Sequence, residues 1–194
     1  MRNSLVDDCV SAGVLFLGAN GELESVAVTR VVPRPDGSYG MGVVAQNSLE
    51  SGATPTVSLR YGRIAEAVEA GFSLTNGEAT VLGQLVENVV ASSRGFGDAY
   101  AVTFRGTLTT LSMDGSEARA AERAAVAMFG ATASLAATDL FCSAIDIAVS
   151  DHQGASSTLE DRGDNVCGCD GETDVCKALG PTLEPPEPLD PLGE

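Results

Sequence analysis

The cysteines are the residues whose type and spacing could most readily support chemistry. Cys167, Cys169 and Cys176 lie close together near the C-terminus, and Cys142 precedes them. Four thiolates can hold a zinc ion or an iron–sulfur cluster in a tetrahedral arrangement. The C-x-C-x6-C spacing is not one of the standard metal patterns. Free thiols and one or two disulfides therefore stay open as alternatives, and Cys9 lies far from the group.

Other constellations that could perform catalysis are weak. The single histidine, His152, follows Asp151 and has serines nearby, but a triad requires groups that converge in space, which sequence neighbours do not show. Glu66 and Glu69 are spaced like a solvated helix face. The loop 94–97 has a GxG pattern without the third glycine of a nucleotide loop. We therefore predict no catalytic residues, no cofactor apart from the metal hypothesis, and a chain that is not an enzyme.

The charge is distributed unevenly along the chain. The 194 residues carry 27 acidic and 11 basic side chains, for a net charge of −16. More than half of that net charge falls in residues 151–194, which also hold three of the five cysteines and six of the eight prolines. This shift predicts a globular domain over 1–150, followed by an acidic segment over 151–194 that cannot form a core alone. Such an acidic chain is a poor direct binder of nucleic acid.

The last residues form an acidic, proline-rich tail. Its prolines favour an extended polyproline II conformation, and Leu183, Leu189 and Leu192 are its large apolar side chains. The tail is either a solvated segment or a strap that drapes over a neighbouring subunit. In the second case the three leucines are the candidate partner-binding residues.

The domain shows signals for both strands and helices. Alternating apolar residues and turn signals at Asn20-Gly21 and Pro35-Asp36-Gly37 predict a three-stranded meander over residues 14–45. Further strands are expected at 56–61, 100–104, 107–112 and 141–149.

Three segments have helical spacing. Residues 62–70 place Ile64, Ala65 and Val68 on one face, and 76–92 follow the i, i+3, i+4 pattern behind a capping box. The alanine-rich stretch 117–129 is the third. Together these elements predict an α+β fold, in which helices pack on one face of a mainly antiparallel sheet and an irregular, acidic tail rich in cysteine and proline follows. We see no internal repeat.

The chain lacks the apolar stretch of about 20 residues that a membrane helix needs. Two acidic residues, Asp7 and Asp8, stand where a signal peptide would have its apolar run. These observations predict no membrane association and no export by a signal peptide, with assembly in the cytoplasm or in a virion.

Small residues, an alanine-rich segment, an extended tail and the lack of a catalytic constellation favour a non-enzymatic structural or assembly subunit of a larger particle. A capsid-decorating, connector or tail protein of a virion fits this profile. Its partners would be other protein subunits, in a homo- or hetero-oligomer. Two alternatives are a small metal- or redox-linked module built on the cysteine cluster and a sensor domain that binds a small ligand.

Overall fold

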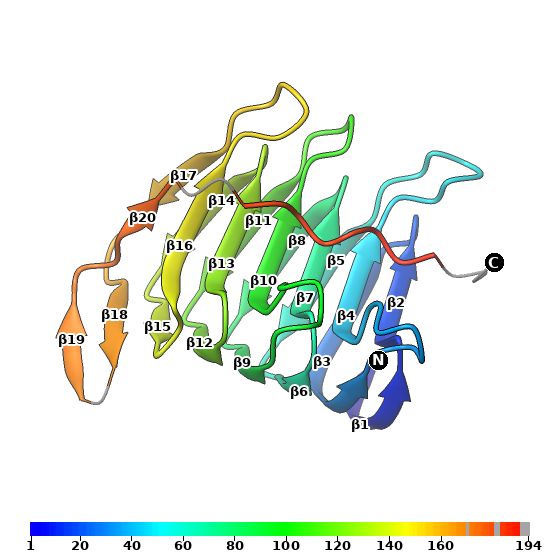
Figure 1. The fold of residues 1–194 in the computed structure, drawn as a ribbon, viewed down its shortest axis with the longest axis horizontal. Helices are drawn as coiled ribbons and strands as arrows, with labels where there is room; N and C mark the ends of the chain where they lie inside the picture. The colour runs from blue at the N-terminus through cyan, green and yellow to red at the C-terminus, as the bar shows by residue number, and fades with distance from the viewer. Residues whose placement is uncertain (170, 181–182, 191–194) are drawn as a thin grey trace.

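The computed structural model describes residues 1–169, 171–180 and 183–190, and every regular element in these ranges is a strand (Figure 1). The predicted α+β class is therefore wrong, because no helix occurs in the described residues. Nor does this part of the chain contain a helix that is long and apolar enough to cross a membrane.

The strands form three rows, and each turn of the chain adds one strand to each row. The first row contains β5 (Thr56–Arg60), β8 (Glu78–Leu82), β11 (Thr110–Asp114), β14 (Thr132–Ala136) and β17 (Thr158–Asp161). The second row contains β6 (Arg63–Ala67), β9 (Leu85–Val89), β12 (Glu117–Ala121), β15 (Asp139–Phe141) and β18 (Val166–Cys169). The third is a seven-stranded sheet of β2 (Ala12–Leu17), β4 (Met41–Gln46), β7 (Ala70–Thr75), β10 (Asp98–Thr103), β13 (Ala124–Phe129), β16 (Ile145–Ser150) and β20 (Ala178–Leu179).

The first two rows are joined through one long strand. β3 (Gly21–Val32) pairs with β5 through its first residues and with β6 through its last, and Ser25 lies between these two stretches with a φ of 53°. β1 (Arg2–Val10) pairs with β3 in parallel. Pairing along the rows is parallel throughout, except between β18 and β19 (Glu172–Asp174), which are antiparallel. The architecture is a parallel β-solenoid.

The core is built from inward side chains stacked coil upon coil. Because the register repeats, the same position of each coil lies beside its equivalent in the next. One such column contains Ile64, Val86, Ala118, Leu140 and Cys167, each at most 1% exposed. A parallel stack of this kind buries one continuous apolar core.

The residues predicted as helices lie in pairs of short strands separated by corners. Leu82 ends β8 and Leu85 begins β9, with Gly83 at a φ of 59° between them. Inward-pointing residues alternate along each strand, and the corner residues change the interval between the last inward residue of β8 and the first of β9. The apolar residues of the two strands together therefore have the spacing of one helix. The stretch 117–129 forms β12 and β13. Its alanine side chains are small enough for the close packing on both faces of β13. Tertiary packing here overrides the helix propensity of alanine.

The predicted antiparallel meander is also wrong. β2, β3 and β4 are consecutive in the chain, but β2 pairs with β4 in parallel and β3 belongs to a different row. The turn at Pro35-Asp36-Gly37 is present, since Gly37 N donates to Arg34 O at 2.8 Å. Strands β17, β18 and β20 extend the three rows beyond residue 150, where the sequence predicted the domain to end.

A glycine inside the stack provides a test of this packing. A Cβ at Gly71 would lie 2.3 Å from Val86 Cγ1 and 2.7 Å from the backbone oxygen of Ala99. We expect Gly71→Ala to destabilise the protein by about 1–3 kcal/mol through overpacking. A Cβ at Gly180 would meet only Val149 O at 3.7 Å, so Gly180→Ala is the matched control. Denaturant unfolding measures both, and equal midpoints for the two variants would contradict the packing.

Candidate functional site

The outer face of the third row is covered by the C-terminal tail. We call residues 183–190 the strap; they cross β16, β13, β10, β7 and β4 and run from the last coils back toward the first (Figure 1). Every residue of β4, β7, β10 and β13 is buried. Strands buried on both faces are rich in apolar residues, and these strands also bury a few polar ones, such as Gln46 and Asp98.

Two of the three predicted leucine anchors contact this face. Leu189 is 4% exposed and packs in an outer cluster that includes Tyr39, Met41 and Val44. Leu183 packs against a second outer cluster, which includes Phe129. Leu192 lies outside the described residues. The sequence assigned these leucines to a neighbouring subunit, whereas Leu183 and Leu189 here contact the chain's own domain.

The strap backbone is recognised by a buried side chain. Gln46, at the end of β4, is 2% exposed. Its Nε2 donates to Leu189 O at 2.7 Å, and its Oε1 accepts from Leu189 N at 2.8 Å. The amide therefore satisfies both backbone groups of one strap residue, as a neighbouring strand would. Tyr39 Oη also accepts from Asp190 N at 3.2 Å.

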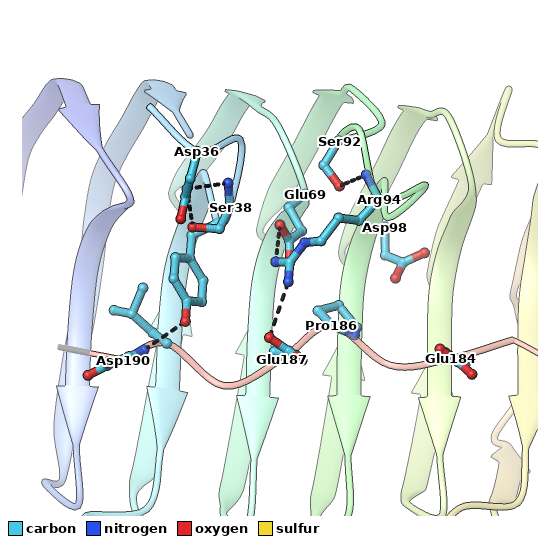
Figure 2. A network of polar contacts seen from close by, with 12 residues as sticks. Asp36, Ser38, Glu69, Ser92, Arg94, Asp98, Glu184, Pro186, Glu187 and Asp190 are labelled. Atoms are coloured by element: carbon cyan, nitrogen blue, oxygen red, sulfur yellow. Dashed lines mark hydrogen bonds and ion pairs between the residues drawn. The ribbon is translucent and has the colours of Figure 1, made fainter. Parts of the chain in front are cut away.

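Four arginines from successive parts of the solenoid line the path of the strap. We call Arg34, Arg94, Arg105 and Arg123 the arginine row. Arg34 donates to Asp190 O at 2.6 Å, Arg123 to Glu184 O at 3.0 Å, and Arg105 to Pro186 O at 3.5 Å. Arg94 makes an ion pair of 3.2 Å with Glu187 (Figure 2). Together with Tyr39, Gln46 and the two outer clusters, the arginine row forms what we call the strap groove.

Two buried carboxylates fix the middle of the arginine row. The Glu69 and Asp98 side chains are fully buried, and they pair with Arg94 and Arg123. Arg94 Nη2 lies 2.9 Å and 3.0 Å from the two Glu69 oxygens. Burial raises the pKa of both carboxyls, an effect that hydrogen bonds from the arginines partly offset. Glu69 is thus not part of the solvated helix face that its spacing with Glu66 suggested.

Aromatic rings support the same guanidinium groups. Arg34 lies over the Tyr39 ring at 4.7 Å, and Arg123 lies over the Phe96 ring at 5.0 Å. Arg94 contacts both rings, at 5.8 Å and 5.3 Å. Planar guanidinium groups stack in this way while donating in the plane, which an ammonium group does not do. Ten of the 11 basic residues are arginine, and this bias was the available signal for a row that sequence reasoning missed.

The predicted metal ligands are joined in two disulfides, Cys142–Cys169 and Cys167–Cys176. A disulfide sulfur has no thiolate charge to offer a metal, and no cluster of potential metal ligands is found among the described residues. Cys167 ends the inward column of the second row, so the disulfides fasten the weakly apolar last coils to the core. Cys9 is a free thiol at the opposite end of the stack.

The other sequence candidates are dispersed. Asp151 and the serines near His152 do not form a triad with it: Ser157 Oγ donates to Ser150 O, and its backbone N donates to Asp151. The loop 94–97 holds no phosphate pattern, but it supplies Arg94 and Phe96 to the strap groove. The strap groove is therefore the candidate functional site, because side chains from several coils converge there on one segment of the chain.

Removing the Cys142–Cys169 disulfide tests how far it stabilises the last coils. The bond closes a loop with a sequence separation of 27. We expect the double variant Cys142→Ser/Cys169→Ser to lose about 3 kcal/mol in denaturant unfolding, chiefly through the entropy of the unfolded chain. Cys9→Ser, which removes a free thiol, is the control. A double variant as stable as the control would contradict this role.

The buried Glu69 predicts a pH dependence. Its folded pKa is raised above the ordinary value of 4.5, so the folded state holds this proton to a higher pH than the unfolded state. The contribution of Glu69 to the free energy of unfolding therefore falls as the pH rises through that window. Relative to Glu69→Gln, the wild type should lose stability in denaturant titrations as the pH rises above about 4.5, the ordinary pKa of this carboxyl.

Arg94→Gln should widen the pH range over which the stability contribution of Glu69 falls, because the guanidinium that lowers the Glu69 pKa is removed. The opposite sign, with Glu69 contributing more stability as the pH rises, would show that the ion pair dominates over burial.

The chain matches no protein-family model and shows no significant similarity to a curated protein or to a solved structure.

Proposed function

We propose that this chain is a non-enzymatic assembly module whose strap groove recognises an extended, acidic, proline-containing segment. Its own tail fills the groove within one molecule, and the tail of a neighbouring subunit takes the same place in an assembly. The partners are then other protein subunits, in a homo- or hetero-oligomer.

The contact between Gln46 and Leu189 carries this proposal. The buried Gln46 amide forms hydrogen bonds with both the N–H and the C=O of one extended residue, so it recognises the backbone of a polypeptide. The neighbouring Leu189 cluster adds a side-chain preference. Backbone hydrogen bonds that provide affinity and pockets that provide specificity are the usual means of recognising an extended peptide.

The charge distribution supports the same partner chemistry. The protein is strongly acidic, yet four of its ten arginines line one groove. An acidic segment is attracted to this groove and repelled elsewhere, which favours correct docking over other contacts. The acidic tail already lies along the arginine row of its own chain.

The two disulfides favour an oxidising site of assembly. Disulfides persist outside the cell and in compartments such as the periplasm, whereas cytosolic thiols are kept reduced. We therefore propose that the protein acts in an oxidising environment, in place of the cytoplasmic assembly expected from the sequence.

A chain shortened to residues 1–180 should bind a labelled peptide of residues 183–190 in trans. We expect saturable binding by fluorescence anisotropy that weakens as salt is added, because the arginine row contributes charge. Gln46→Ala should weaken binding by about 10-fold or more, since two hydrogen bonds to buried groups are lost. A peptide carrying Leu189→Asp is the matched ligand control, and circular dichroism checks that the shortened chain stays folded.

Failure of the folded, shortened chain to bind this peptide would refute recognition by the groove. Exchange between subunits is tested separately by the native mass of the full-length chain: an oligomer that dissociates when the chain is shortened supports it, and a monomer at all concentrations contradicts it.

Binding of a small ligand remains a second candidate function. A cavity of about 390 Å³ lies beside the Cys142–Cys169 disulfide and is lined by Arg119 and Phe141, among others. Its volume lies within the range of ligand pockets.

A further inference from the structure

A second cavity lies between the strap and the solenoid. Its volume is about 490 Å³, and the solenoid lines it with Arg94, Phe96, Arg105 and His152. The strap lines it with residues between Leu183 and Glu187. The cavity is separate from the Gln46–Leu189 contact that carries the proposed function.

Arg105 differs from Arg94 and Arg123 in the arginine row because no carboxylate pairs with it among the described residues. Arg94 pairs with Glu69 and Glu187, and Arg123 pairs with Asp98. In the part of the chain that the structure describes, Arg105 has no carboxylate within ion-pair distance and its buried Nε has no hydrogen-bond partner. A half-buried guanidinium without a counterion is costly, most notably in a chain with a net charge of −16.

His152 brings a second unsatisfied nitrogen to the same cavity. Its Nε2 is buried and also lacks a partner among the described residues. Burial lowers the pKa of His152, and the positive charge of Arg105 lowers it further, so the two groups are electrostatically coupled.

The backbones that carry both side chains are held in place. Asn76 Oδ1 accepts from Arg105 N at 2.7 Å, and Asn76 Nδ2 donates to Arg105 O at 2.8 Å. His152 N donates to Ala155 O at 2.9 Å, and Ala155 N donates back to His152 O at 3.0 Å. The two side chains therefore extend from fixed points, which lowers the entropic cost of binding a ligand between them.

We propose that this cavity binds a small oxyanion, such as sulfate or phosphate, between the side chains of Arg105 and His152, which both line it. The anion accepts a hydrogen bond from each side chain and balances the charge of Arg105. The other charged groups that line the cavity are Arg94, which is already paired, and Glu184 and Glu187 on the strap. These glutamates are exposed, so solvent and salt screen their repulsion of an anion.

Because a protonated imidazole attracts an anion more strongly than a neutral one, anion binding favours the protonated form of His152, and anion binding and proton uptake are linked. His152 is the only histidine, so its imidazole protons give an unambiguous NMR signal in the full-length protein. We would titrate this signal against pH in sodium sulfate and in sodium chloride at equal ionic strength. The midpoint should be higher in sulfate by at least about half a pH unit.

Arg105→Gln should abolish the difference between the two salts. Arg60→Gln, which removes an arginine exposed at the end of β5, should preserve it. Equal midpoints in sulfate and chloride for the wild type, or a difference that survives in Arg105→Gln, would overturn the proposal.

Melting temperatures provide a second test that does not depend on whether Arg105→Gln folds. Sulfate should raise the melting temperature of the wild type more than that of His152→Gln, both taken relative to chloride. Equal gains in the two proteins would also overturn the site. Neither result depends on whether the strap groove binds a second tail.

Discussion

Each coil of the solenoid is held to the next by parallel backbone hydrogen bonds in three rows, and this stacking decides where every side chain lies. A residue that points inward in one coil must lie on the equivalent residue of the next, about 4.8 Å away. The column from Ile64 to Cys167 shows the result, since its residues differ in size but are all apolar and at most 1% exposed. The chain's wealth of alanine, valine and glycine follows from this constraint.

The same constraint creates the need for a strap. Alternation along β4, β7, β10 and β13 places apolar residues on both faces, so the outer face must be covered. Leu183 and Leu189 supply the apolar cover, three residues to each side of Pro186, which is the spacing of one face of a polyproline helix. Three such residues span about 9.3 Å, close to two coil spacings. The repeat of the proline-rich tail therefore matches the spacing of the coils that it crosses.

The sequence allowed individual strands to be predicted but not their arrangement. The middle strand of the meander expected over residues 14–45 corresponds to β3, and the strand expected at 56–61 corresponds to β5, because alternation is a local property. The parallel stack was missed because loops such as 47–55 and 104–109 make the coils unequal and hide the repeat. Corners such as Gly83 then restart the alternation out of phase, which produced false helical spacing.

The candidate site was predictable only in part. The tail leucines were recognisable as anchors because they are the large apolar residues of an otherwise polar segment. Their contact with the chain's own sheet was not predictable, since Leu189 meets Gln46 across a sequence separation of 143. The arginine row is assembled from positions that become neighbours only when the coils stack, so no local motif reveals it.

The strap also has a consequence for how the protein acquires its structure during synthesis. Coils can stack in order as they leave the ribosome, because each contacts mainly its neighbours. The strap follows the coils in the sequence, yet it closes contacts with residues as early as Arg34. Until the strap has been synthesised, the outer face of the third row stays uncovered, and this apolar surface exposes the nascent chain to aggregation.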